Sequence, residues 1–261
     1  YELFYPAQSV FDYMDLSKLT GLSIPNNREY SVRHFDGGFQ RFLHFNSARD
    51  IQTFLQKSNV AELHFGGVYE KPLSNPSSHN HAVYKEYVID IDISDYHNVR
   101  TCSCEKTRFC ALCWKFVEAA AQVINVIFDS SLAYKKYQWF FSGKKGLHCH
   151  VRDTNALKMS QAVRTHLSKF IAYPKKQRGT PYNQAYSQVL KPFFHEFLLG
   201  PFDIFSNSIN RQTAIELLPE FKREYFEKEP ESSSEYFQEY MDALRDCYFD
   251  SRAKELKRQL V

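Results

Sequence analysis

The stretch that decides the fold is EYVIDIDI, residues 86–93. Its isoleucines, valine and tyrosine favour a β-strand. Side chains alternate across a strand, so Asp90 and Asp92 share one face and the three isoleucines share the other. Two carboxylates on one face repel each other unless a cation lies between them. The pair therefore predicts a site for two Mg²⁺ or Mn²⁺ ions, as in two-metal phosphoryl transfer. The alternative is an exposed strand with solvated acids.

Four cysteines follow this strand within twelve residues: Cys102, Cys104, Cys110 and Cys113. Four thiolates so close together suit tetrahedral Zn²⁺ with no open coordination position, which indicates a structural metal site. Buried free cysteines, or a redox pair formed by Cys110 and Cys113, are the alternatives. The two remaining cysteines, Cys149 and Cys247, are expected to be packing residues.

A second motif, SGKKGLH at residues 142–148, joins two expected strands. Glycines such as Gly143 let backbone amides approach an anion, Ser142 offers a hydroxyl, and Lys144 and Lys145 add positive charge. His148 can donate an imidazole N–H to a phosphate oxygen. We interpret the motif as a triphosphate cradle, although its spacing differs from that of a Walker loop. A basic hairpin with solvated lysines is the alternative, and a metal pair formed by His148 and His150 is a further one.

Outward from these motifs, the apolar patterns predict a mixed α/β domain followed by a helical subdomain. The domain would span residues 1–155, with the cysteine knuckle at 102–113, and the subdomain would span residues 156–261. Strands are expected at 28–32, 39–45, 61–69, 86–93, 138–141 and 147–151, and helices at 1–20, 47–58, 114–132 and 235–261.

Composition bounds the functional class only loosely. The chain has 261 residues, 43% of them apolar and 24% charged, with a net charge of +3, which permits a polyanionic partner without demanding one. The many Phe and Tyr residues are expected in the core. Without an uninterrupted run of 18 apolar residues or a signal-peptide pattern, neither a transmembrane helix nor a membrane partner is expected. The clustered cysteines favour a reduced, intracellular protein.

Taken in order, these blocks resemble the small, catalytic subunit of eukaryotic-type DNA primases, in the archaeo-eukaryotic primase superfamily. The resemblance runs from Tyr1 to about Phe226. It rests on the acidic strand at 88–96, the cysteine motif at 102–114, the SGxxGxH motif at 142–148, the segment 28–31 with Arg41, and the segment 65–69.

The resemblance implies the primase catalytic fold, with mixed β-sheets flanked by helices, the zinc knuckle and a helical subdomain. It implies a nucleotidyltransferase (a DNA-directed RNA polymerase) that synthesises short RNA primers on single-stranded DNA during replication. Asp90 and Asp92 would be catalytic, the 142–148 motif would bind ribonucleoside triphosphates, and Glu29 and Arg41 would lie near metal and nucleotide. It also implies a heterodimer with a primase large subunit, a DNA polymerase alpha complex (the primosome), and a nuclear location.

Two departures from the family pattern stand out. The family usually has Arg at the position of Lys145, and often at Lys144, and Lys lacks the planar fork that contacts phosphate bidentately. No block after residue 226 matches the family's third catalytic aspartate, so we expect the chain to be truncated before that strand. The alternative functions are a non-catalytic, zinc-stapled scaffold that binds nucleotides or nucleic acid, and a primase-polymerase that also incorporates deoxynucleotides.

Overall fold

The computed structural model describes residues 5–17, 27–71, 81–105, 108–172, 182–216 and 231–242. The chain forms two compact units, each assembled from several segments. The first unit comprises Tyr1–Ile89, Tyr134–Gln138 and Cys149–Phe170, and the second comprises Asp90–Ala133, Trp139–His148 and Ile171–Val261. The expected division at residue 155 stays a prediction.

The first unit contains an antiparallel sheet in the order β2-β1-β3. The predicted hairpin is confirmed, because β1 and β2 meet at a turn in which Gly37 has φ +89°, a left-handed conformation that suits glycine. In register, Val32 lies opposite Gln40 on one side and Leu63 on the other. The strands are β1 (Arg28–His34), β2 (Phe39–Leu43) and β3 (Val60–Val68).

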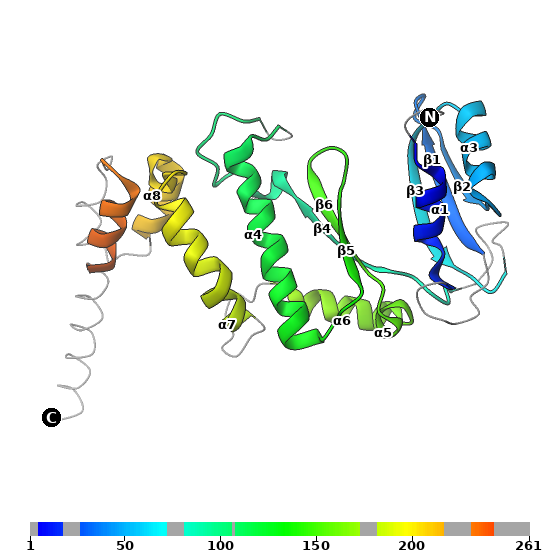
Figure 1. The fold of residues 1–261 in the computed structure, drawn as a ribbon. Coiled ribbons are helices and arrows are strands. Elements are labelled where there is room, and N and C mark those ends of the chain that lie inside the picture. Colours follow the sequence, from blue (N-terminus) through cyan, green and yellow to red (C-terminus); the bar gives the residue numbers. More distant parts are fainter. Residues whose placement is uncertain are drawn as a thin grey trace. The chain divides into compact units, whose positions relative to one another are not determined.

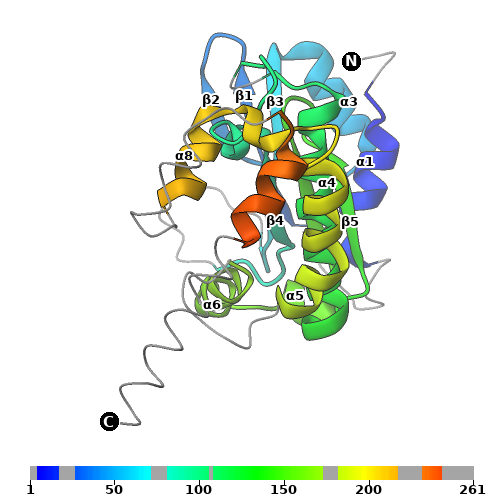
Figure 2. The same cartoon turned by 90° about the vertical axis from the view of Figure 1, so that its left-hand side faces the viewer.

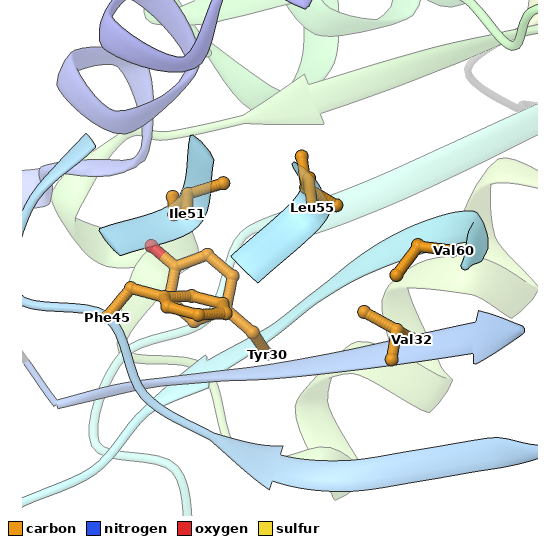
Figure 3. Packing of buried hydrophobic residues seen from close by; sticks show 6 residues of the cluster. All are labelled: Tyr30, Val32, Phe45, Ile51, Leu55 and Val60. Carbon is orange, nitrogen blue, oxygen red and sulfur yellow. The ribbon is translucent and has the colours of Figure 1, made fainter. Parts of the chain in front are cut away.

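Helix α3 (Ala48–Lys57) covers this sheet and closes the core of the first unit. It begins where the Ser47 side chain accepts a hydrogen bond from the Asp50 amide at 3.2 Å, an ordinary N-cap. Ile51 and Leu55, one turn apart, pack with Tyr30 and Val32 of β1, all of them buried (Figure 3). Helix α1 (Ala7–Met14) packs beside α3 (Figure 1).

A second three-stranded sheet has the order β4-β6-β5. It contains β4 (Tyr87–Asp92), β5 (Tyr137–Phe141) and β6 (Gly146–Val151), so the three predicted strands are confirmed. Boundaries differ from the prediction by one residue, and two of these differences bear on the site. Residues Ile93–Tyr96 turn into a 3-10 helix, and Gly146 belongs to β6 rather than to the turn before it. As a result, Asp92 is the last residue of β4, and Lys145 directly precedes the first residue of β6.

Helix α4 (Ala111–Ile127) is the centre of the second unit. It begins three residues before the expected start at Trp114, because Cys110 acts as its N-cap, and it continues as a π-helical turn, Phe128–Leu132. The buried Phe116 contacts Phe202 edge-on at 5.0 Å and stacks on Tyr96 at 5.4 Å. The expectation of an aromatic core is confirmed here.

Shorter helical segments complete the two units. The first unit has α5 (Thr154–Leu157) and most of α6 (Gln161–Ile171). The second has α7 (Tyr182–Ala185), which packs against α4 (Figure 2), π-helical turns Tyr186–Leu190 and Phe193–Leu198, a 3-10 turn Ile204–Ser206, and α8 (Ser208–Glu216). Residues 233–242 are helical, and the remainder of the expected 235–261 helix lies outside the described residues.

One helical stretch among the described residues, Ala111–Leu132, is long and apolar enough to cross a membrane by length and composition alone. Polar residues interrupt its apolar run, so the sequence did not predict it as a candidate. Half of its apolar window is buried inside the protein, including Phe116, Val117 and Ile124. That is the pattern of a core helix, which passes the same test.

Candidate active site and metal centre

Asp92, the last residue of β4, lies at the centre of a polar cluster. Its Oδ2 is 2.7 Å from Lys145 Nζ. Its Oδ1 accepts hydrogen bonds from the Ser94 amide at 2.8 Å and from the Ser94 hydroxyl at 2.7 Å. Both carboxylate oxygens are therefore engaged, so the carboxylate is held in one orientation.

These contacts shift the acidity of both partners. Burial acts to raise the pKa of the Asp92 carboxyl, but hydrogen bonds from Lys145 and Ser94 outweigh it and hold the pKa below its ordinary value. The hydrogen bond to Asp92 raises the pKa of Lys145 above its ordinary value. Carboxylate and ammonium therefore both stay charged at neutral pH.

The hairpin between β5 and β6 brings Lys145 to β4. The Ile93 amide donates to the Lys145 carbonyl at 2.9 Å, which ties the start of β6 to the end of the acidic strand. Within the hairpin, Ser142 Oγ accepts from the Gly146 amide at 3.0 Å and from the Lys145 amide at 3.4 Å. The Ser142 oxygen thus satisfies amides that were expected to face an anion, and its hydroxyl proton is left to donate.

The two glycines of this hairpin serve different purposes. Gly143 has φ +85°, and a Cβ on it would meet no atom within 4 Å, so glycine is needed there for its backbone conformation. A Cβ on Gly146 would lie 2.2 Å from the Ile91 carbonyl oxygen, so Gly146 is needed because β6 approaches the backbone of β4 closely. No positive φ is involved at Gly146.

Alanine at these glycines is expected to separate the two effects. Gly143→Ala should cost about 1 kcal/mol of stability, the penalty for an L-residue in left-handed backbone. Gly146→Ala should cost more, about 1–3 kcal/mol, because a backbone atom must move. Guanidinium denaturation followed by circular dichroism measures both values. An equal cost for the two variants would contradict the close approach of the strands.

Asp90 has a separate partner and a more open position. Its Oδ1 lies 3.4 Å from His148 Nε2, and 67% of its side chain is exposed against 24% for Asp92. Lys144 is also exposed at the tip of the hairpin. The acidic strand and the basic hairpin are thus brought together in the second unit, and Asp90 keeps open faces for a ligand.

Glu29 and Arg41 belong to the first unit. Arg41 donates to Glu29 Oε1 from Nε at 3.1 Å and from its terminal nitrogen at 2.9 Å. Glu29 is buried at the base of this pair, and about half of the Arg41 side chain is exposed. The buried Glu29 carboxylate thus anchors a guanidinium on a side chain that is about half exposed. Its expected place near the metal and nucleotide stays a prediction.

The four cysteines of residues 102–113 converge as a knuckle at the start of α4. Their four Sγ atoms lie within 4.8 Å of one another, and those of Cys110 and Cys113 are 3.8 Å apart. Four sulfurs about 2.3 Å from one tetrahedral Zn²⁺ would be about 3.8 Å apart, so the donor set fits a structural metal. Among the described residues, this is the one cluster of three or more potential metal ligands.

Backbone amides tune the thiols of this knuckle. The Cys110 amide donates to Cys113 Sγ at 3.2 Å, and the Cys113 amide donates back to the Cys110 thiol. That bond from the Cys113 amide lowers the pKa of Cys110 to about 7, whereas burial raises the pKa of Cys104 to about 12. The buried Arg100 braces the loop by donating to the Arg108 and Glu105 carbonyls at 2.9 and 3.2 Å.

The donor set of Asp90 and Asp92 suits a hard divalent cation in its chemistry. Both residues offer carboxylate oxygens at the end of one strand, the ligands that Mg²⁺ and Mn²⁺ prefer. The Lys145 ammonium supplies the compensating positive charge at Asp92. No third carboxylate joins them within the part of the chain that the structure describes.

Sequence reasoning missed Ser94 and the direct pairing of Lys145 with Asp92. The first had a local signal, because a serine two residues after an aspartate commonly closes an Asx-type turn. The second had none, because 53 positions in the chain separate the two residues and only strand pairing brings them together.

Comparison with known proteins extends these observations. The family model described as DNA primase small subunit matches residues 89–257. The chain is 29% identical over 213 residues to the DNA primase small subunit of Saccharomyces cerevisiae, covering 76% of this chain and 52% of the relative. It is 30% identical over 176 residues to that of Caenorhabditis elegans, covering 65% and 42%. It is also 25% identical over 150 residues to the DNA primase small subunit PriS of Pyrobaculum aerophilum, covering 56% and 46%.

Fold and site together define a mixed α/β protein with a four-cysteine knuckle that fits a structural metal such as zinc. The chain belongs to the DNA primase small subunit family, because the family model matches well over half of it. The resemblance drawn from the motifs is confirmed. The chain spans about half the length of the curated relatives it matches.

Proposed function

We propose that this chain carries the nucleotidyltransferase site of a DNA primase small subunit, which builds short RNA primers on single-stranded DNA from ribonucleoside triphosphates. The observation that supports this most is the pairing of the acidic strand with the basic hairpin. Lys145 contacts Asp92 at 2.7 Å, and His148 lies 3.4 Å from Asp90. Family membership supplies the reaction class.

Asp90 and Asp92 would hold the divalent ions in this proposal. Bound Mg²⁺ or Mn²⁺ would supply Lewis-acid stabilisation of the triphosphate and lower the pKa of the attacking 3′-hydroxyl. Ser94 holds one oxygen of Asp92 in place and so leaves the second oxygen to exchange partners. The ion pair between Asp92 and Lys145 keeps the Asp92 carboxylate ionised before a metal ion binds.

The hairpin residues would bind the triphosphate. Ser142 retains a hydroxyl proton to donate, Gly143 shapes the turn, and Lys144 is exposed at its tip. Lys145 would turn from Asp92 to a phosphate oxygen once a divalent ion neutralises the carboxylate. His148 would donate from its imidazole to a phosphate, and Arg41, held by Glu29, would contact the nucleotide.

The remaining expectations also belong to this proposal. We infer a catalytic α/β domain over residues 1–155 and a helical subdomain beyond it. We also infer that a primase large subunit and the DNA polymerase alpha complex are partners, in the nucleus. The name of the curated relatives, primase small subunit, supports a further subunit as partner. The four cysteines would hold zinc for stability rather than for chemistry.

Calorimetric titration with a ribonucleoside triphosphate, with and without Mn²⁺, tests the proposal. Wild-type protein should bind more tightly with Mn²⁺. Asp90→Asn/Asp92→Asn should abolish that difference, because losing even the outer partners of a metal costs about 10- to 100-fold in affinity. Glu118→Gln is the matched control, because Glu118 is a partly exposed helix acid of the same unit, paired with Lys115.

Retained Mn²⁺ dependence in the double variant would exclude these aspartates as the metal ligands. Wild-type protein that is folded and zinc-loaded but binds no nucleotide would favour the scaffold function instead. A loss of the dependence in Glu118→Gln as well would indicate a general charge effect and would count against the site.

A further inference from the structure

Three aromatic side chains form a cluster that the proposed chemistry leaves unused: Phe109, Trp114 and Phe141. The ring centroids of Phe109 and Trp114 are 4.7 Å apart, those of Trp114 and Phe141 are 5.8 Å apart, and those of Phe109 and Phe141 are 6.5 Å apart. The three rings thus contact one another in a single patch, which we term the aromatic triad.

Two rings of the triad, Phe109 and Phe141, are exposed rather than part of the core, and the third, Trp114, is partly buried. Phe141 is 55% exposed and Phe109 is 39% exposed, and the neighbouring Leu112 is 43% exposed. Other phenylalanines of the same unit are buried, such as Phe116 and Phe202, whose exposed fractions are 7% or less. Exposed rings gathered in one place gain little from folding, so they indicate a binding surface.

Chain connectivity places the triad beside both motifs of the site. Phe109 directly precedes Cys110, and Trp114 directly follows Cys113, so the knuckle holds both rings. Phe141 is the last residue of β5 and directly precedes Ser142 of the hairpin. All three residues belong to the second unit, as do Asp90 and Asp92. A ligand on the triad would therefore be continuous with one at the hairpin.

Charges around the triad are positive but largely compensated. Arg108 lies 3.8 Å from Glu105, and both side chains are well exposed. Lys115 lies 2.6 Å from the partly exposed Glu118. Lys144, at the hairpin tip, adds positive charge. Among the described residues, a polyanion would find one or two uncompensated cations here, whereas its bases would find three rings, two of them exposed. Stacking rather than phosphate neutralisation would dominate its affinity.

We propose that the aromatic triad is a stacking platform for the bases of single-stranded nucleic acid, next to the triphosphate cradle. This rests on the proposed function, because it supplies that site with a place to hold its single strand. Base stacking on an aromatic side chain is tolerant of sequence and needs an exposed ring on a rigid support. The knuckle and the hairpin provide that support.

The test is fluorescence anisotropy of a labelled short oligo-dT with the whole chain. Phe141→Ala should weaken binding about tenfold, as removal of a stacking partner does. Phe141→Tyr should bind like wild type, and Phe141→Leu should be as weak as Phe141→Ala, because leucine keeps the apolar contact but not the ring. Tyr186→Ala is the matched control, because Tyr186 is 58% exposed elsewhere in the same unit. Its affinity should not change.

Salt dependence gives a second readout. With one or two phosphates neutralised, the slope of log affinity against log salt should lie between about −0.7 and −1.4. A much steeper slope together with unchanged binding by Phe141→Ala would overturn the platform, as would wild type that does not bind oligo-dT. Oligo-dT binding by Phe141→Leu as tight as that of wild type would also overturn it, because an apolar contact rather than stacking on a ring would then hold the strand. Thermal unfolding of each variant shows that it is folded.

Failure of the platform and failure of the proposed function are distinguishable. If the Mn²⁺-dependent nucleotide binding is absent but oligo-dT binding depends on an aromatic ring at 141, the platform stands alone. If nucleotide binding follows Asp90 and Asp92 while oligo-dT binding ignores Phe141, the nucleotide site stands and the platform is wrong.

Discussion

Removal of metal from the four-cysteine knuckle is expected to destabilise the second unit more than any other single change. The four Sγ atoms lie within 4.8 Å of one another, and Cys113 is fully buried in the first turn of α4. Without an ion, four thiols and the buried Arg100 would be left to hold a loop with little core of its own. Structural zinc contributes about 10–16 kcal/mol in zinc-finger peptides, an upper bound here.

The measurement is thermal unfolding by circular dichroism before and after treatment with a strong chelator, with zinc content determined by elemental analysis. Cys113→Ser should lose the bound metal and unfold at a lower temperature. Cys149→Ala is the control, because Cys149 is buried outside the knuckle and its loss should cost about 1 kcal/mol. A metal-free wild type with the same unfolding curve would refute a structural role for the ion.

Glu86→Gln is expected to cost about 3–5 kcal/mol, because it removes one partner of a buried ion pair. Glu86 accepts from Arg28 at 2.9 and 3.1 Å, and Arg152 Nε lies 3.9 Å from the same carboxylate. Arg28 and Glu86 are 3% and 6% exposed. Neutralising the carboxylate would leave two buried guanidinium groups without their counter-charge.

The first unit contains a matched control for this change. Arg33 and Glu62 pair at 3.2 Å across β1 and β3, but both side chains are at least half exposed. Glu62→Gln should therefore cost less than about 0.5 kcal/mol. Denaturant unfolding of the two variants measures the contrast, and equal costs would show that burial of the Arg28–Glu86 pair is not what matters.

The same pair predicts how stability depends on pH. Burial acts to raise the pKa of Glu86, but the charge and hydrogen bonds of Arg28 outweigh it and set the pKa below its ordinary value of 4.5. A depressed carboxyl pKa stabilises the fold above the unfolded value, and that stability is lost as pH falls through the folded value. Wild type should thus lose stability below about pH 4.5, and Glu86→Gln should show a flatter curve there.

Much of the local structure could be predicted because its cause is local. Alternating isoleucines and aspartates specify the strand β4, the Asp36-Gly37-Gly38 turn specifies the first hairpin, and the cysteine spacing specifies the knuckle. Element boundaries were less predictable. Helix α4 begins at Ala111 because Cys110 acts as its N-cap. The sequence did not predict this start, because a thiol is not a common N-cap residue.

Sequence alone indicated the family, the succession of the main strands and helices along the chain, and the acidic, basic and cysteine motifs of the candidate sites. Each of these depends on local spacing and periodicity. Only the tertiary structure decided which residues contact one another at the site. Lys145 forms an ion pair with Asp92, and Gly146 packs closely against the Ile91 carbonyl. Phe141 contacts the ring of Trp114 beside the knuckle. These contacts depend on strand register and on segments far apart in the chain, and neither leaves a local signal in the sequence.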